Sequence, residues 1–350
     1  MSEVLGESAR GRSLRVLYLV FNYPQISESY IEAELAFMRR AGVHVEVWRH
    51  TSSAACYPTD VPIHEGDFAN AIARSQADLV HLHWMLWGED VYDFLAQFGL
   101  PVTVRAHTDF TPERASMLAA HPAVGRVYLF PHQLAQLNLA HEKLVPLPVA
   151  YDETLHFLSV EKDIRLVVRA AAAQPWRRLD TFIDVAQRCP EHHFVLCLAN
   201  TRVDGADPFV NDLLERNRAL GSPVEIRLDV PLQEAAELQR RAGTYLHTAA
   251  PDGGAGMPIS IAEAMAAGCR VLVNGAPVLR DLVGEAGESY SDAAHAASLI
   301  RESLGWTSEQ WKAGAAAAAQ RAQSRHASSV LLPCMLDDWI RLTATSARLV

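Results

Sequence analysis

The sequence predicts an α/β protein built from two consecutive parallel-sheet domains. Short runs rich in β-branched residues alternate with amphipathic segments along the chain, which is the pattern of strands covered by helices. This alternation occurs twice, and an irregular stretch of prolines and acids at residues 145–162 separates the two series. The length of 350 residues suits two domains of ordinary size, each with its own core.

The first series of strands lies in the N-terminal half. Residues 14–21 form an apolar run that predicts the first strand, and an amphipathic helix follows and ends at Gly42. Further strands are predicted at residues 45–49, 77–84, 101–107 and 126–130. Each strand ends in polar or aromatic residues, and the ligands of open α/β sheets bind at the carboxyl ends of the strands. We therefore expect ligand contacts directly after these strands.

The second series begins after the irregular stretch. Its strands are predicted at residues 164–170, 194–200, 224–230, 244–249 and 269–274. Helices are predicted from about Leu179, Pro208 and Leu232. An alanine-rich helix at residues 308–323 and a last helix at residues 328–345 complete the series. This order of elements predicts a second parallel sheet followed by two helices.

Composition excludes several classes of function. The net charge of −10 disfavours nucleic acid and anionic membranes as partners, because both attract basic surfaces. Apolar runs are shorter than a bilayer span and the first residues lack an apolar signal core, so we expect a cytoplasmic protein without stable membrane insertion. The five cysteines are scattered, and the fifteen histidines form no HExxH or Cys/His box, so neither a disulfide framework nor a metal site is expected.

A glycine-rich turn at residues 251–256 leads into an apolar helix that carries one acid, Glu263. The glycines let the backbone approach a ligand without a Cβ clash, and Pro258 suits the first helical position because its missing N–H would be unpaired there. A helix that begins near Ile259 presents free N–H groups and a positive dipole end, which suit phosphate. The same residues also fit an ordinary core helix with Glu263 facing solvent.

Residues 256–268 read GMPISIAEAMAAG and resemble the donor-binding signature of the retaining glycosyltransferases of family four. That signature is written as Glu, seven residues, Glu, and then Ala-Met-Ala-x-Gly. Its second Glu matches Glu263, whereas its first falls on Ala255, so this chain lacks one acid of the pair. The resemblance favours a donor site over a plain core helix.

The resemblance extends unevenly from about Leu14 to Thr345. In the first half, YPQISESYIEAEL resembles the family segment P-x-x-S-E-T-F-I-x-x-E, and RAHTDF resembles its x-H-G-x-D turn, with His107 on the histidine. ADLVHLHW resembles D-x-x-H-x-H-W, and VPLPVAYDETLHF resembles P-x-G-V-D-x-x-x-F, although the usual glycine is Pro148 here. In the second half, WRRLDTFIDVA resembles K-K-G-L-D-T-L-I-E-A.

Together these motifs imply the GT-B architecture, in which two Rossmann-like domains face a central cleft and the C-terminal helix crosses back to the first domain. The implied boundaries are residues 1–150 for an acceptor domain, 151–330 for a nucleotide-sugar donor domain and 331–350 for the crossing helix. The implied activity is retaining transfer of a sugar from a nucleoside-diphosphate sugar to a saccharide, lipid-linked or natural-product acceptor. The resemblance also implies metal-independent transfer, so neither a metal nor a cofactor is expected.

The resemblance assigns roles to basic residues as well. Arg169 matches the family's phosphate-binding arginine, and Arg177 best matches its lysine, with Arg178 beside it as a further donor-binding candidate. The two matched positions are spaced further apart than usual, but a guanidinium still binds a diphosphate with two donors at once. Arg177 and Arg178 also fit an exposed helix start, although cations there oppose the helix dipole.

Near the predicted helix, the resemblance implies the donor contacts. Glu263 would accept hydrogen bonds from the two ribose hydroxyls, and His107 would approach the donor sugar from the other domain. His107 could instead be satisfied within its turn, because Asp109 stands two residues away and can cap the loop. The other donor-binding positions are Gly254, Ala255, Gly256, Met257, Pro258, Ser260 and Ile261, of which Gly256 and Met257 would offer N–H groups to the sugar and the last two to the phosphates.

The acid missing at Ala255 leaves three explanations open. Asp252 reaches the sugar from three residues upstream, the donor is an unusual sugar that lacks the matching hydroxyl, or transfer is lost. Retaining transfer by front-face attack needs no nucleophile from the enzyme, so an active transferase is the leading hypothesis. The alternatives are a catalytically impaired nucleotide-sugar-binding homologue or partner subunit, and an enzyme of the same fold that hydrolyses or epimerises the nucleotide sugar. No feature of the sequence indicates an oligomeric state.

Overall fold

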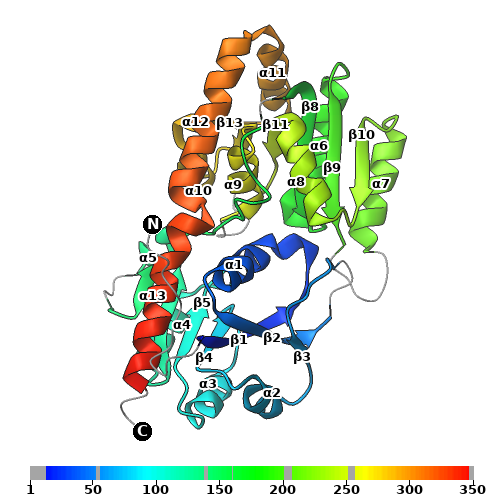
Figure 1. Cartoon of the computed structure of the whole chain (residues 1–350). Coiled ribbons are helices and arrows are strands. Elements are labelled where there is room, and N and C mark those ends of the chain that lie inside the picture. Colours follow the sequence, from blue (N-terminus) through cyan, green and yellow to red (C-terminus); the bar gives the residue numbers. More distant parts are fainter. Residues whose placement is uncertain are drawn as a thin grey trace.

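Two parallel sheets, each covered by helices, make up the protein (Figure 1). The computed structural model describes residues 13–52, 56–137, 141–159, 161–200, 207–250 and 257–346. Within these residues, one sheet has seven strands and the other has six. All the neighbouring strands that pair in them are parallel. The predicted α/β class with two parallel sheets in tandem is confirmed.

The first sheet has the strand order β3-β2-β1-β4-β5-β6-β7. Helices bury both of its faces, which is why its strands read as nearly continuous apolar runs. The winding of the chain reverses between β1 and β4, and such a switch point is where open sheets bind ligands. The elements are β1 (Arg15–Asn22), η1 (Ile26–Glu28), α1 (Ser29–Arg40), β2 (His44–Thr51), β3 (Ile63–His64), α2 (Phe68–Ser75), β4 (Leu79–His83), α3 (Glu89–Ala96), β5 (Val102–Arg105), α4 (Pro112–Ala120), β6 (Val124–Leu129), α5 (Pro131–Leu134) and β7 (Leu144–Pro146).

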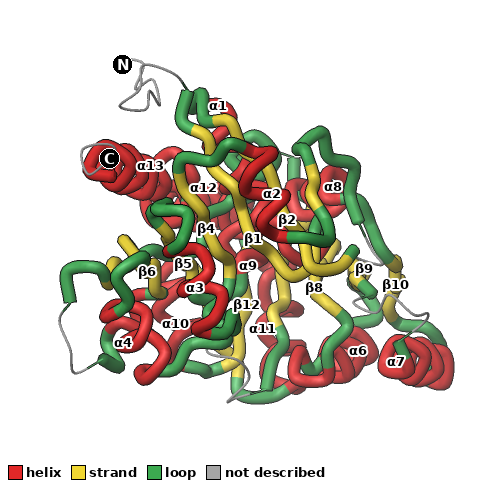
Figure 2. Tube along the Cα trace, turned by 90° about the horizontal axis from the view of Figure 1, so that it is seen from below, coloured by secondary structure: helices red, strands yellow, loops and turns green. Residues whose placement is uncertain are grey.

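The second sheet has the order β10-β9-β8-β11-β12-β13, with its switch point between β8 and β11. Figure 2 shows helices on both sides of the yellow strands. The elements are β8 (Asp163–Ala172), η2 (Pro175–Arg177), α6 (Leu179–Arg188), β9 (His193–Ala199), α7 (Pro208–Ala219), β10 (Val224–Leu228), α8 (Leu232–Arg241), β11 (Ala242–His247), α9 (Ile259–Ala266), β12 (Arg270–Asn274), α10 (Pro277–Val283), η3 (Gly284–Ala286), β13 (Gly287–Tyr290), α11 (Ala293–Glu302), η4 (Ser303–Gly305) and α12 (Ser308–His326).

The last helix, α13 (Ser328–Ser346), leaves the second sheet and packs against the first domain, beside α1 (Figure 1). Trp339 is fully buried in the core there, and Asp338 accepts a hydrogen bond from the Tyr128 hydroxyl at 3.3 Å. Arg126 Nε lies 3.3 Å from the other Asp338 oxygen. The expected crossing of the C-terminal helix is confirmed, and the helix begins at Ser328, where the predicted helix at residues 328–345 begins.

Sequence patterns miss the shortest elements. The two-residue strand β3 and the helices α2 to α5 lie in segments for which only strands or loops were expected. β7 lies partly within the stretch assigned to the domain joint, because its proline obscures the strand pattern. It forms the edge of the sheet, where a proline is tolerated. Among the described helices, none combines the length and apolar character needed to cross a bilayer.

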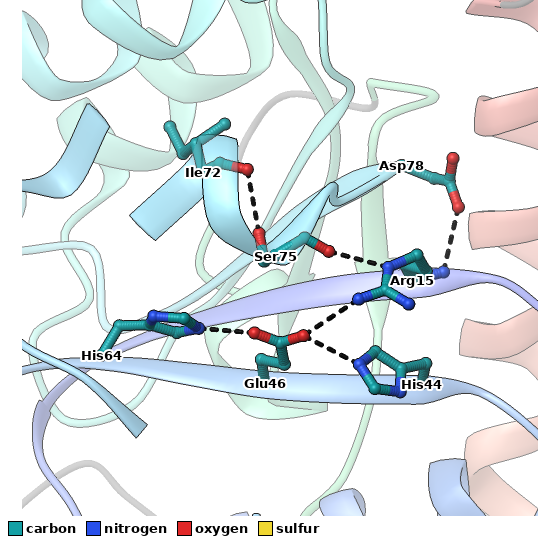
Figure 3. A network of polar contacts seen from close by, with 7 residues as sticks. All are labelled: Arg15, His44, Glu46, His64, Ile72, Ser75 and Asp78. Carbon is teal, nitrogen blue, oxygen red and sulfur yellow. Dashed lines mark hydrogen bonds and ion pairs between the residues drawn. The ribbon is translucent and has the colours of Figure 1, made fainter. Parts of the chain in front are cut away.

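A network of polar contacts connects β1, β2 and β3 near the amino ends of β1 and β2 (Figure 3). Glu46 on β2 accepts hydrogen bonds from Arg15 on β1 at 3.1 Å and from His44 at 2.8 Å, and its other oxygen contacts His64 on β3. Burial alone would raise the pKa of Glu46, but the contacts with His64 and His44 hold that pKa below its usual value. The network ties the sheet together at the end opposite the carboxyl ends of the strands.

Candidate functional site

A cavity of about 730 Å³ lies between the two domains. From the first domain it is lined by residues 25–30 after β1, Trp84 after β4, His107 after β5 and Phe130 after β6. From the second domain it is lined by segments at the ends of β8, β9, β11 and β12 and by the start of α9. Because open parallel sheets bind ligands at the carboxyl ends of their strands, this cavity is the candidate functional site.

The amino end of α9 forms part of the cavity wall. Met257, Pro258 and Ser260 line the cavity, and the helix begins at Ile259 as expected. No side chain caps this end, so the first-turn N–H groups lack the partner that a capping residue would supply. Ile261 differs from the expectation: it is fully buried, does not line the cavity, and its N–H donates to the Pro258 carbonyl at 3.1 Å.

Glu263 lies about one turn inside α9 and lines the cavity. Its Oε1 accepts a hydrogen bond from the Ser29 hydroxyl at 2.6 Å, and the ring of His156 approaches the same oxygen at 3.6 Å. Burial lowers the pKa of His156, so this ring is neutral at neutral pH. Ser29 starts α1 in the first domain, so the Ser29–Glu263 bond joins the two domains directly.

The Arg169 side chain lies behind the cavity wall and does not reach the cavity. It is buried on β8. Its guanidinium donates to the Thr248 carbonyl at 3.3 Å and to the Ser260 hydroxyl at 3.4 Å, and it also contacts Tyr245. Arg169 therefore supports the start of α9, and its expected contact with a diphosphate stays a prediction.

Of the two neighbouring arginines, only Arg177 lines the cavity. Its Nε is buried without a hydrogen-bond partner, and no carboxylate among the described residues forms an ion pair with it. Burial, together with the nearby Arg169 cation, lowers the pKa of Arg177 to about 10, so it remains charged at neutral pH. A partly buried cation without a counter-charge favours an anionic ligand.

Arg178 does not reach the cavity. Its backbone adopts a left-handed conformation with φ +48°, and its side chain is 49% exposed. The guanidinium pairs with Asp180 on α6, with both hydrogen bonds at 3.1 Å. The two arginines are adjacent in sequence but differ in position, because the turn at η2 directs Arg177 into the cavity and Arg178 to the surface.

His107 follows β5 and is almost completely buried against aromatic rings. Its ring centroid lies 4.8 Å from that of Tyr30 and 5.1 Å from that of Trp84. Its Nε2 lies 3.0 Å from Nδ1 of His83, and its backbone N–H donates to Asp109 at 3.0 Å. Burial, and then the charge of neighbouring groups, lowers the pKa of His107 well below its usual value, so the ring is neutral.

A buried carboxylate lies beside these histidines. Nε2 of His83 lies 3.4 Å from Oε1 of Glu34, whose pKa stays well below its usual value despite burial because His83 and Arg105 stabilise the charge. Through its Nδ1, His83 in turn contacts Nε2 of His107.

Glu34, His81 and His83 also have the spacing of a metal site. His81 Nε2 lies 3.2 Å from Oε1 of Glu34, and Arg105 Nη1 lies 3.1 Å from its Oε2. The guanidinium already balances the carboxylate charge. Arg105 therefore balances the charge of the cluster without a metal ion, and His83 of the cluster contacts His107.

Several cavity residues received no individual role from the sequence, although they lie in the YPQISESY and ADLVHLHW segments that resemble family motifs. Glu28, Ser29 and Tyr30 line the cavity from the start of α1, and the signal for them was present in the YPQISESY segment. Trp84 lines it with φ +69°, a left-handed conformation that is uncommon for a bulky residue and that often marks functional sites. Asp252, Gly254, Ala255 and Gly256 lie outside the described residues.

No protein-family model matches the sequence, and no curated protein does. Solved structures do share its shape. HepE from Anabaena, in complex with UDP and glucose, matches with a TM-score of 0.71 and 15% identity, covering 93% of this chain and 98% of that one. Sucrose-phosphate synthase from Thermosynechococcus elongatus matches with a TM-score of 0.70 and 15% identity, covering 95% and 100%.

A third similar structure is AviGT4, a glycosyltransferase involved in avilamycin A biosynthesis, with a TM-score of 0.62, 17% identity and coverage of 95% of this chain and 98% of that one. The chain has the GT-B fold. This fold confirms the expected arrangement of two α/β domains with the C-terminal helix on the first. At these levels of identity the likeness establishes the fold, and the chemistry must be argued from the cavity itself.

Proposed function

We propose that the protein is a glycosyltransferase that takes its sugar from a nucleoside-diphosphate sugar. The observation that carries the proposal is Arg177, a partly buried cation with a buried, unpaired Nε and no counter-charge among the described residues, in the cavity that the start of α9 also lines. A cation and a helix amino end together suit a diphosphate. The similar HepE structures in complex with UDP and with UDP-glucose support a nucleotide sugar as the donor.

In this proposal, breaking the bond between the anomeric carbon and the diphosphate oxygen leaves negative charge on the nucleotide. Arg177 and the first-turn N–H groups of α9 stabilise that charge, and Arg169 holds Ser260 in place behind them. Glu263 accepts hydrogen bonds from the ribose hydroxyls in place of the hydrogen bond from Ser29. These residues supply charge stabilisation without a metal.

The retaining course of the reaction is part of the proposal. The acceptor hydroxyl attacks the anomeric carbon on the face that the diphosphate leaves, its proton passes to the departing diphosphate oxygen, and the bonding pair leaves with the nucleotide. His107 approaches the donor sugar from the first domain. The acceptor, a saccharide, lipid-linked sugar or natural product, enters beside the first domain, and burial of the site between the domains limits hydrolysis.

The two adjacent arginines provide a matched test. Arg177→Ala is expected to weaken the binding of UDP, GDP or dTDP roughly 10- to 100-fold, because one charged hydrogen bond is worth ~1.5–3 kcal/mol. Arg178→Ala removes an equal charge that is already paired with Asp180 and is expected to change affinity less than about twofold. Calorimetric titration measures both. Equal effects of the two variants would contradict the assignment of the diphosphate to Arg177.

A further inference from the structure

Glu28 is a partly buried acid whose side chain has no hydrogen-bond partner among the described residues. It is the last residue of η1 and the N-cap residue of α1, yet its side chain makes no capping hydrogen bond. Its Oε2 is buried and has no hydrogen-bond partner among the described residues. A buried carboxyl oxygen without a partner costs stability, and Glu28 lines the cavity, so a ligand there can supply the missing hydrogen bond.

The charge state of Glu28 indicates what kind of ligand that is. Burial raises the pKa of Glu28 to about 8, and no cation opposes this shift. At neutral pH the side chain is therefore mostly an uncharged carboxylic acid, which donates from its O–H and accepts at its other oxygen. When ionised, it would repel a phosphate. Both states suit neutral hydroxyl groups.

The neighbours of Glu28 locate it within the cavity. Ser29, the next residue, donates to Glu263 at 2.6 Å across the domain boundary. Tyr30, the one after, places its ring 4.8 Å from that of His107. Consecutive Cα atoms are ~3.8 Å apart, so Ser29 and Tyr30 are close neighbours. This short segment therefore connects Glu263, which is expected to bind the ribose, with His107, which is expected to approach the sugar. Glu28 starts this segment.

We propose that Glu28 binds hydroxyl groups of the sugar that the nucleotide carries, and thereby determines which donor sugars the protein accepts. This inference rests on the proposed function, since it requires a nucleotide sugar in the cavity. It assigns to the first domain a carboxyl contact with the donor sugar. A site built to hydrogen-bond a hydroxyl discriminates against sugars that lack it, because the buried polar group is then left unpaired.

The test compares each nucleotide with its sugar conjugate in three forms of the protein. UDP and UDP-glucose, GDP and GDP-mannose, and dTDP and dTDP-glucose are titrated calorimetrically into the wild type, Glu28→Gln and Glu28→Met. Gln keeps one donor and one acceptor, whereas Met keeps the length of the side chain and removes both oxygens, which guards the fold. Glu113→Ala, an exposed acid on α4 that does not line the cavity, is the control.

We expect Glu28→Met to lower the affinity for the nucleotide sugar roughly tenfold, which is the effect of losing one hydrogen bond to a buried group. The affinity for the parent nucleotide is expected to stay the same. Glu28→Gln and Glu113→Ala are expected to remain within about threefold of the wild type. If Glu28→Met leaves both affinities unchanged, or lowers the affinities for the nucleotide sugar and the nucleotide equally, the inference about Glu28 is overturned while the proposed function stands. A wild type that binds none of the six compounds overturns the proposed function, and this inference with it.

Discussion

Arg177 and Glu28 line the same cavity, and neither finds a partner of opposite charge within the part of the chain that the structure describes. Their surroundings explain this. Arg177 ends the short turn η2, whose geometry exposes its neighbour Arg178 instead, and Glu28 precedes a helix that it does not cap. Such unmet charges and hydrogen bonds lower stability, and proteins keep them mainly where a ligand completes them.

The raised pKa of Glu28 predicts a pH-dependent stability. Its folded-state pKa of about 8 exceeds the value of ~4.3 expected in the unfolded chain, so the protonated acid stabilises the fold fully below pH ~4.3, and this contribution is lost as the pH rises through 8. Its titratable neighbour Tyr30, whose pKa is raised well above 10, does not ionise in this range. Glu28→Gln removes the effect.

The melting temperatures of wild type and Glu28→Gln are therefore expected to agree near pH 4 and to diverge by pH 8.5, with the variant the more stable. Differential scanning calorimetry across this range measures the difference. A constant difference between the two proteins at all pH values would show that burial does not raise the pKa of Glu28.

The sequence locates those candidate residues that follow a strand or start a helix in a matched motif. Glu263, Arg177 and His107 were predicted in this way, and all three line the cavity. It does not distinguish Arg177 from Arg178, because a single left-handed residue decides which one turns inward. It gives Glu28 no individual role, because the YPQISESY motif does not show which of its side chains line the cavity without a partner.

At the scale of elements, the site depends on the meeting of α1 and α9. Each helix starts at the carboxyl end of its sheet, and the hydrogen bond from Ser29 to Glu263 joins the first residue of one to an acid one turn into the other. The strands that carry these helices are long and apolar, and they were predicted. Short elements such as β3 and α5 were not, because a few residues carry too little periodicity.

Substitution of two glycines, Gly243 and Gly314, probes how closely the strands and helices of the second domain pack. A Cβ on Gly243 in β11 would lie 2.8 Å from the Ile164 Cα of the adjacent strand, whereas a Cβ on Gly314 in α12 would meet nothing closer than 4.0 Å. Gly243→Ala is therefore expected to lower the free energy of unfolding by ~1–3 kcal/mol through overpacking. Gly314→Ala is expected to raise it by ~0.5–1 kcal/mol, because alanine restricts the unfolded chain.

Urea-induced unfolding followed by circular dichroism gives both values. Because the substitutions are chemically identical, a shared change in handling or solubility would affect them equally. Shifts of the same sign for the two variants would contradict the packing described for β8 and β11.

At the scale of the whole molecule, the two domains share a cavity, and α13 and a hydrogen bond are among the contacts that connect them. The helix α13 returns to the first domain and buries Trp339 there, and the Ser29–Glu263 hydrogen bond joins the walls of the cavity. A ribose that binds Glu263 competes with Ser29, so donor binding and the relative position of the domains are coupled in the proposed function. The crossing helix was predicted only through family resemblance, since no local pattern states where a helix packs.

In the proposed function, a nucleotide sugar bound in this cavity transfers its sugar to an acceptor. The most direct test of this claim is the release of free nucleoside diphosphate from UDP-, GDP- and dTDP-sugars, measured with saccharide, lipid-linked and small natural-product acceptors. We predict release from at least one donor that increases when an acceptor is added, and a rate roughly 100-fold lower in Arg177→Ala, the loss typical for a group that stabilises developing charge. Nucleotide binding without release from any donor and acceptor would contradict the claim and would instead favour a nucleotide-sugar-binding protein that has lost transfer.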